Sequence, residues 1–186
     1  MTKSNVSRAS RAKIGGKSVV EPCACCGIAR DPQGRPFSIT FDQPDVVFDI
    51  EEELLDTWGA DPFLAIKNVG FFLRVILPVQ LTDGFSVDFG TWLEIHAEDF
   101  RTAWTTWNFP EYGDLEIEGY VANAINPWGK LPHELVKAIV RDPAQVPYLA
   151  SSSNPLVSKI LADTWPHAEV LTSYSELLKP DPKLEG

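Results

Sequence analysis

Residues 71–79, with the sequence Phe-Phe-Leu-Arg-Val-Ile-Leu-Pro-Val, decide the fold of this chain. Apart from Arg74, the run is apolar at every position, as expected for a central strand whose two faces are both covered. Phe63–Lys67 precedes it, and Ser86–Ile95 follows it across the turn Thr82-Asp83-Gly84. These three segments predict an antiparallel meander at the centre of a sheet.

Further strands extend this sheet on both sides of the meander. Residues 37–41 and 115–121 alternate apolar and polar side chains, which places one face of a strand against a core and the other in solvent. Two short apolar segments, Leu135–Arg141 and Val146–Ala150, are expected to be strands as well. The chain therefore contains enough strands for one mixed domain with a well-developed core.

Three segments have the features of helices. Ala97–Trp107 carries acidic residues in its first turn, where the helix dipole favours negative charge, and apolar residues at i, i+3, i+4 and i+7 spacing. Ser153-Asn154-Pro155 combines capping residues with a first-turn proline and predicts a helix that reaches Trp165. Glu51–Trp58 is expected to be a short acidic helix that ends at Gly59. The predicted fold class is α+β, a single domain with a mostly antiparallel sheet and two or three helices.

Charge is unevenly distributed along the chain. The 186 residues include 16 basic and 26 acidic side chains, a net charge of −10. Residues 1–20 hold five of the bases and no acid, so the remainder carries 11 bases and 26 acids, a net charge of −15. We expect residues 1–20 to be a disordered basic extension, 21–178 a single domain and 179–186 a frayed tail. An organelle transit segment or a nucleic-acid-binding arm stays an alternative for residues 1–20.

Three features of the sequence bear on the compartment. The N-terminal region lacks the apolar stretch of a secretory signal, and no run approaches the roughly 18 apolar residues of a membrane span. All three cysteines fall within Cys23–Cys26, so no distant cysteine exists with which a disulfide could staple the domain. The sequence therefore predicts a reduced, cytoplasmic protein that has no membrane partner.

The cysteine cluster is the strongest candidate for chemistry. Cys23 and Cys26 form a Cys-x2-Cys pair with Cys25 between them, which is half of a zinc knuckle. A closed zinc site needs more ligands, yet no second pair exists, and His96, His133 and His167 are isolated in sequence. The pattern therefore favours thiols without a cofactor, and zinc at these cysteines is the alternative. A catalytic cysteine would need a nearby histidine that the sequence does not nominate.

Acidic and aromatic residues mark candidate interfaces. One acidic edge follows residue 41, a second lies on the outer face of the strand at 115–121, and two tryptophans sit at the ends of elements. The interface candidates are Asp42, Asp45, Asp49, Glu51, Glu52, Trp58, Glu116, Glu118 and Trp128. The common hydrolase, metalloprotease and dinucleotide-binding motifs do not occur, which disfavours an enzyme without excluding one.

Five segments stand in a characteristic order: Cys23–Gly27, Phe41–Asp45, Phe71–Arg74, Thr91–Ile95 and Pro147–Pro155. Together they resemble a small bacterial family known as domain of unknown function 2199, over roughly residues 22–175. The resemblance implies no established activity. The family pattern places histidines where this chain has Arg30 and Asn154, so a metal role of those histidines would be lost here.

The acidic body limits the function classes. It disfavours nucleic-acid binding, because phosphate contacts require clustered lysine and arginine. It favours an intracellular module that binds a basic protein partner, for example an immunity protein or antitoxin that blocks a basic toxin. Two alternatives stay open. One is a small zinc-binding or cysteine-dependent enzyme of unknown reaction, and the other is a nucleic-acid-mimicking inhibitor that uses the acids of Glu51–Asp56 and Glu111–Glu118.

Overall fold

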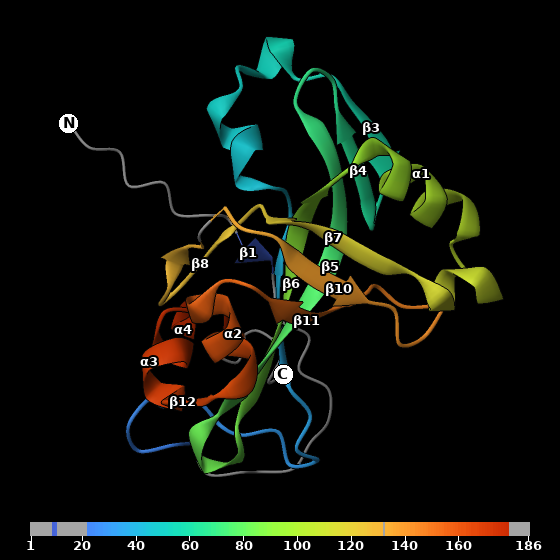
Figure 1. Ribbon diagram of the computed structural model, residues 1–186. Helices are drawn as coiled ribbons and strands as arrows, with labels where there is room; N and C mark the ends of the chain where they lie inside the picture. The colour runs from blue at the N-terminus through green and yellow to red at the C-terminus, as the bar shows by residue number, and fades with distance from the viewer. Residues whose placement is uncertain (1–8, 11–21, 132, 179–186) are drawn as a thin grey trace, which may run out of the picture.

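The computed structural model describes residues 9–10, 22–131 and 133–178 (Figure 1). Apart from the two residues of β1 (Ala9–Ser10), the predicted disordered extension 1–20 and the predicted tail 179–186 lie outside the described residues. None of the helices in the described ranges is long and apolar enough to span a membrane. The fold class is α+β, as predicted, with four α-helices and a sheet that is mostly antiparallel.

A five-stranded barrel forms the centre of the molecule. Its two long strands, β5 (Gly70–Leu81) and β6 (Ser86–Ile95), pair antiparallel from Phe71 opposite Ile95 to Gln80 opposite Ser86. The antiparallel order continues through β7 (Glu116–Val121), β10 (Val136–Ile139) and β11 (Tyr148–Ser152). A parallel pairing of Tyr148 with Ile76 on β5 closes the ring. Closure leaves these five strands without an open edge.

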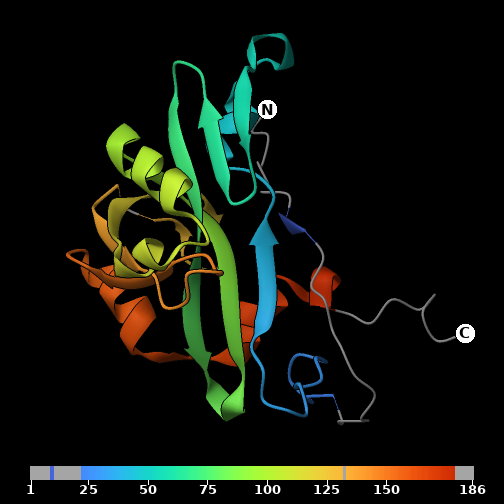
Figure 2. The same cartoon turned by 90° about the vertical axis from the view of Figure 1, so that its right-hand side faces the viewer.

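Further strands extend the barrel at the two long strands. On the β5 side, β4 (Phe63–Ile66) and then β3 (Thr57–Ala60) continue the antiparallel order, which completes the predicted meander of residues 63–95. On the other side, β2 (Phe37–Phe41) runs parallel to β6 and also pairs with β1 (Figure 2). A small hairpin of β8 (Ala124–Ile125) and β9 (Gly129–Lys130) stands apart from this sheet.

The helices lie at two places on this sheet (Figure 1). Helix α1 (Ala97–Thr106) covers β3 and β4, where the ring of Phe63 meets those of Phe100, Trp104 and Trp107 edge-on. Helices α2 (Pro155–Ala162), α3 (His167–Thr172) and α4 (Ser175–Leu178) gather at the opposite end. Strand β12 (Thr164–Trp165) runs parallel to the end of β5 and carries the chain from α2 into α3.

The sequence predictions for α1, α2, β2, β4, β5, β6, β7, β10 and β11 are confirmed to within a few residues at each end. Asn154 caps α2 as its side chain accepts hydrogen bonds from the backbone N–H groups of Leu156 and Val157. The sequence analysis predicted no helix after Trp165, so the short helices α3 and α4 were missed. Four further turns are 3-10 helices, η1 (Asp45–Asp49), η2 (Glu52–Leu54), η3 (Thr82–Gly84) and η4 (Pro110–Asp114).

The predicted acidic helix at residues 51–58 is wrong. Only Glu52–Leu54 are helical, and they form the single 3-10 turn η2. The chain is extended again at Leu55. Thr57 and Trp58 then pair with Ile66 and Ala65 on β4. A helix of eight residues is too short to be stable on its own, whereas β4 supplied backbone partners from Thr57 onward, so strand pairing overrode local propensity.

Candidate metal centre

The three cysteines lie on a tight turn near the start of the described chain. The backbone N–H of Gly27 donates to the carbonyl of Cys23 at 2.8 Å, and the N–H of Cys23 donates to the carbonyl of Ile28 at 3.1 Å. Gly27 has φ = +71°, a left-handed conformation that glycine adopts without steric cost. Ile28 is buried and fixes the turn on the core. The turn brings all three thiols to one side, and none of them forms a disulfide.

His167 reaches the same place from the other end of the chain. It is the first residue of α3, and its backbone N–H donates to the hydroxyl of Thr82 at 3.1 Å. Its ring stacks on Phe85 with centres 4.6 Å apart and planes 10° apart. The residue is 5% exposed. Thr82 and Phe85 flank the turn between β5 and β6, so the tip of the long hairpin holds this imidazole.

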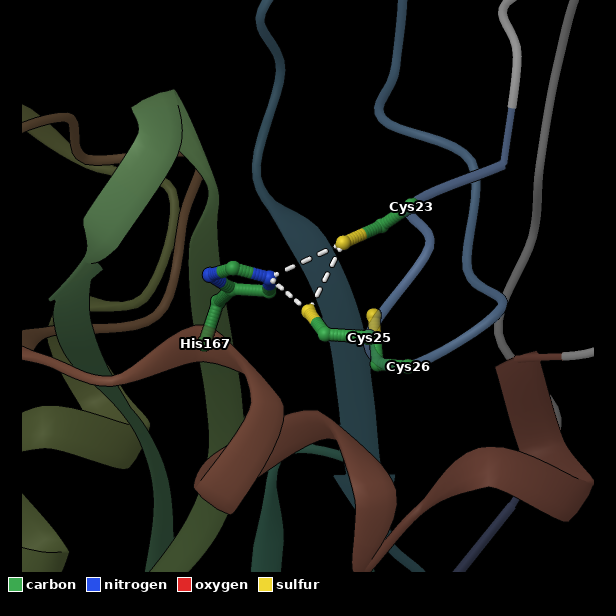
Figure 3. Close-up of side chains that lie close together, drawn as sticks. All are labelled: Cys23, Cys25, Cys26 and His167. Atoms are coloured by element: carbon green, nitrogen blue, oxygen red, sulfur yellow. Dashed lines mark hydrogen bonds between the residues drawn. The ribbon is translucent and has the colours of Figure 1, made fainter.

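The imidazole and the thiols form one cluster (Figure 3). The Nε2 atom of His167 lies 3.2 Å from the sulfur of Cys23 and 3.0 Å from that of Cys25. The sulfurs of Cys23 and Cys25 are 2.9 Å apart. With the sulfur of Cys26 included, all four donor atoms lie within 4.8 Å of one another. Such a set of three sulfurs and one nitrogen could hold a metal ion.

The other side of the imidazole ring decides which nitrogen carries the proton. Nδ1 of His167 lies 2.8 Å from the Thr82 hydroxyl and 3.3 Å from a carboxylate oxygen of Asp83. An ionised carboxylate only accepts hydrogen bonds, so it favours the tautomer with the proton on Nδ1. Nε2 then presents its lone pair to the thiols. Metal-ligating histidines are oriented by this arrangement of a carboxylate or hydroxyl behind the ring.

The thiols titrate unequally. Hydrogen bonds from the side chain and the backbone of Cys25 lower the pKa of Cys23 to about 6, which favours the thiolate form of this sulfur at neutral pH. The shared hydrogen bond with Cys23, together with burial, raises the pKa of Cys25 to about 11. Burial also raises the pKa of Cys26. The cluster thus starts with one thiolate and releases two protons when a cation draws the other sulfurs into the thiolate form.

Sequence reasoning named the three cysteines but missed His167. His167 follows Cys23 by 144 positions in the chain. Neither a spacing motif nor a neighbouring ligand in the sequence marks this histidine. The expectation that no histidine stands near the cysteines is therefore corrected by the structure, which places His167 among them. His96 instead accepts a hydrogen bond from the N–H of Glu98 at the start of α1, and His133 stacks on Tyr120.

The predicted interface residues differ in their exposure to solvent. Asp45 is turned inward, where it accepts hydrogen bonds from the side chain of Asn123 and the N–H of Ala124. Trp128 is half-buried and packs edge-on against Trp165. The exposed candidates are Asp42, Asp49, Glu51, Glu52 and Trp58, which precede β4 in the chain, and Glu116 and Glu118 on β7. The basic partner and the cytoplasmic location both stay predictions.

Residues 22–160 match a family described as an uncharacterised protein conserved in bacteria, domain of unknown function 2199. The chain belongs to this family. The match spans most of the chain and confirms the resemblance seen in the sequence. No curated protein and no solved structure matches the chain.

The family segments that were apart in sequence meet in the structure. The carbonyl of Phe41 accepts hydrogen bonds from Arg74 and from the indole N–H of Trp92. Arg30 and Asn154, the two positions at which the resemblance implied histidines, make other contacts. Arg30 donates to the backbone carbonyl of Asp83, and Asn154 caps α2. The imidazole of the cluster comes instead from His167, which lies beyond the matched residues.

Proposed function

We propose that this protein binds one zinc ion through the sulfurs of Cys23, Cys25 and Cys26 and the Nε2 atom of His167. The observation that carries the proposal is the orientation of His167. Its Nε2 points at two sulfurs at 3.0 and 3.2 Å, while Thr82 and Asp83 occupy Nδ1. A buried imidazole that is held in this way resembles a prepared ligand more than a histidine that merely fills space.

The donor set favours zinc over the hard cations. Three thiolates and one imidazole are soft and borderline ligands, which suit zinc, whereas calcium and magnesium require oxygen. Sulfur ligands at about 2.3 Å from a tetrahedral ion lie about 3.8 Å from one another. The four donor atoms, all within 4.8 Å of one another, need only small side-chain adjustments to reach that arrangement.

The proposed role of the ion is structural. Four protein ligands complete a tetrahedron and leave no position for water or substrate, as in structural rather than catalytic zinc sites. The ion would join the turn at residues 22–29 to α3 and thereby to the tip of the β5–β6 hairpin. Outside the ligands, the described contacts of this turn and of the residue that follows it include the buried Ile28 and the hydrogen bond from Arg30 to Asp83. A zinc ion would add a strong link to these few contacts.

Elemental analysis of untagged full-length protein, expressed with added zinc and purified without chelator, tests the proposal. We expect about one zinc per chain in the wild type and a loss of most of it in Cys23→Ser and His167→Ala. His133→Ala is the matched control, because it also removes one histidine, and it should keep its zinc. A content below one metal ion per several chains, or equal zinc in all variants, overturns the proposal.

A thermal measurement tests the structural role separately from binding. We expect a chelator to lower the melting temperature of the zinc-loaded wild type by several degrees and to leave His167→Ala unchanged. If the chelator removes zinc without moving the melting temperature of the wild type, the ion binds but is not structural.

A further inference from the structure

A groove with a volume of about 700 Å³ lies on the sheet. Its lining residues lie between positions 45 and 133, away from the cysteine cluster in the sequence. Its walls come from η1, from the start of β5 and from the segment that follows β7, and they include Phe48, Asp49, Phe72, Glu94, Lys130 and His133. The lining combines apolar side chains with three acidic ones. The groove is independent of the proposed zinc site, which shares none of its lining residues.

The floor of the groove is set by strand register. Phe72 on β5 lies opposite Glu94 on β6, and Glu94 lies opposite Tyr120 on β7. Directly opposed residues of antiparallel strands project their side chains to the same face of the sheet. The carboxylate of Glu94 therefore stands between two aromatic neighbours. Tyr120 is fixed by His133, whose ring stacks on it at 3.9 Å with planes 8° apart.

Two carboxylates of the groove are available to a ligand. Asp49 and Glu94 make no ion pair or side-chain hydrogen bond with the part of the chain that the structure describes. Asp45 also lines the groove, but it is bonded to Asn123 and Ala124. Lys130 and His133 are the basic side chains in the lining. The lining thus contains three acids and one permanently charged base, Lys130.

Aromatic rings stand beside these carboxylates. Phe48 is 48% exposed on the rim, although a phenylalanine ring gains free energy when it is covered. Phe72 forms part of the floor and is 1% exposed. Carboxylates next to aromatic faces favour ligands that combine an alkyl stem with a cationic head, because the stem packs on the rings while the head meets the charges.

We propose that this groove docks a basic segment of a partner protein, with the stem of a lysine or arginine side chain packed on Phe48 and its charge at Asp49 and Glu94. The charge of the remainder of the chain, −15 for residues 21–186, attracts such a segment over a distance and accelerates its association. The sequence predicted a basic partner from the acidic composition alone, whereas this proposal assigns the binding of that partner to one surface, the groove. It replaces Glu116 and Glu118 by Glu94 among the interface residues.

Hexa-arginine peptide is the probe, titrated into full-length protein at low salt and followed by calorimetry. We expect saturable binding to the wild type and at least a tenfold weaker affinity for Glu94→Gln and for Asp49→Asn. Glu111→Gln is the matched control, since it removes the same charge from an exposed position on η4. Its affinity should stay within twofold of the wild type.

Three results would overturn the proposal. Equal weakening by Glu111→Gln would mean that net charge alone attracts the peptide. Wild-type affinity in both groove variants would place the peptide elsewhere. Free arginine that binds as tightly as hexa-arginine would make the groove a small-molecule site. Because Glu94 is half-buried, unfolding curves must show that Glu94→Gln is folded, and the exposed Asp49→Asn decides the matter if it is not.

Discussion

The guanidinium of Arg74 lies over the indole ring of Trp92, 4.4 Å from its centre, and both side chains donate to the carbonyl oxygen of Phe41. The distances are 2.6 Å from Arg74 Nη1 and 3.1 Å from Trp92 Nε1. The three residues belong to β5, β6 and the end of β2. Their contacts therefore fix the chain after β2 to the two longest strands.

Arg74→Met tests this junction. Methionine keeps much of the apolar stem but removes a charged hydrogen bond to a part-buried carbonyl and the contact with Trp92, so we expect a loss of about 2 kcal/mol in the free energy of unfolding. Chemical denaturation measures it. Arg74 also pairs with Asp61, whose side chain is 69% exposed, and Asp61→Asn should cost less than about 0.5 kcal/mol. Equal losses in both variants would assign the effect to the ion pair.

Thr82→Val tests the support of the proposed zinc ligand. The variant keeps the shape of the side chain but removes the hydroxyl next to Nδ1 of His167. Loss of such a supporting group lowers metal affinity by about 10- to 100-fold in other zinc sites. We expect a fall in that range, measured by competition with a zinc-binding dye. Thr82→Ser retains the hydroxyl and should bind as the wild type does. Tight binding in both variants would show that Thr82 does not orient the ring.

Gly119→Ala tests the contact between β6 and β7. A Cβ atom at this position would lie too close to the carbonyl oxygen of Glu94 and within 2.9 Å of side-chain atoms of Leu93 and Ile95. Because backbone must shift to admit it, we expect a loss of about 3 kcal/mol or failure to fold. Gly129→Ala is the comparison. Gly129 has φ = +72° but open space, so only the backbone cost of about 1–2 kcal/mol applies. A larger loss at Gly129 than at Gly119 would contradict the strand register.

Two buried tyrosines should respond in opposite ways to replacement by phenylalanine. The Tyr112 hydroxyl is buried and has no hydrogen-bond partner among the described residues, so Tyr112→Phe should leave stability unchanged or raise it by up to about 1 kcal/mol. The Tyr174 hydroxyl accepts the N–H of Asn126 at 2.9 Å, so Tyr174→Phe should lower stability by about 1 kcal/mol. Thermal unfolding of both variants measures the difference, and a destabilised Tyr112→Phe would show that its hydroxyl has a partner.

The same two tyrosines predict a loss of stability at alkaline pH. Burial raises the pKa of Tyr112 and of Tyr174 above the ordinary value of about 10. Above pH 10 the unfolded chain releases these protons while the folded chain retains them, so ionisation draws the equilibrium toward the unfolded state. We expect the free energy of unfolding to fall between about pH 10 and 11.5. The fall should be smaller in a Tyr112→Phe, Tyr174→Phe double variant, and an equal fall there would assign it to other groups.

The main elements of the fold could be predicted because local patterns of apolar and polar residues indicate them. The apolar run 71–79 and the alternation in residues 86–95 predicted β5 and β6, and helical spacing predicted α1. Residues 51–60 could not be assigned in this way, since a short acidic segment has no strong preference of its own and takes the conformation of the strand beside it.

The sequence by itself determined the α+β class, the central meander, the family and the three thiols at residues 23–26, because each depends on residues that are close together in the chain. Only the tertiary structure decided that His167 lies among the three thiols and that Phe72, Glu94 and Tyr120 stand in one row. The physical reason is the same in both cases. The closing of the barrel and the pairing of β12 with β5 bring distant side chains together, and local sequence patterns carry no information about such contacts.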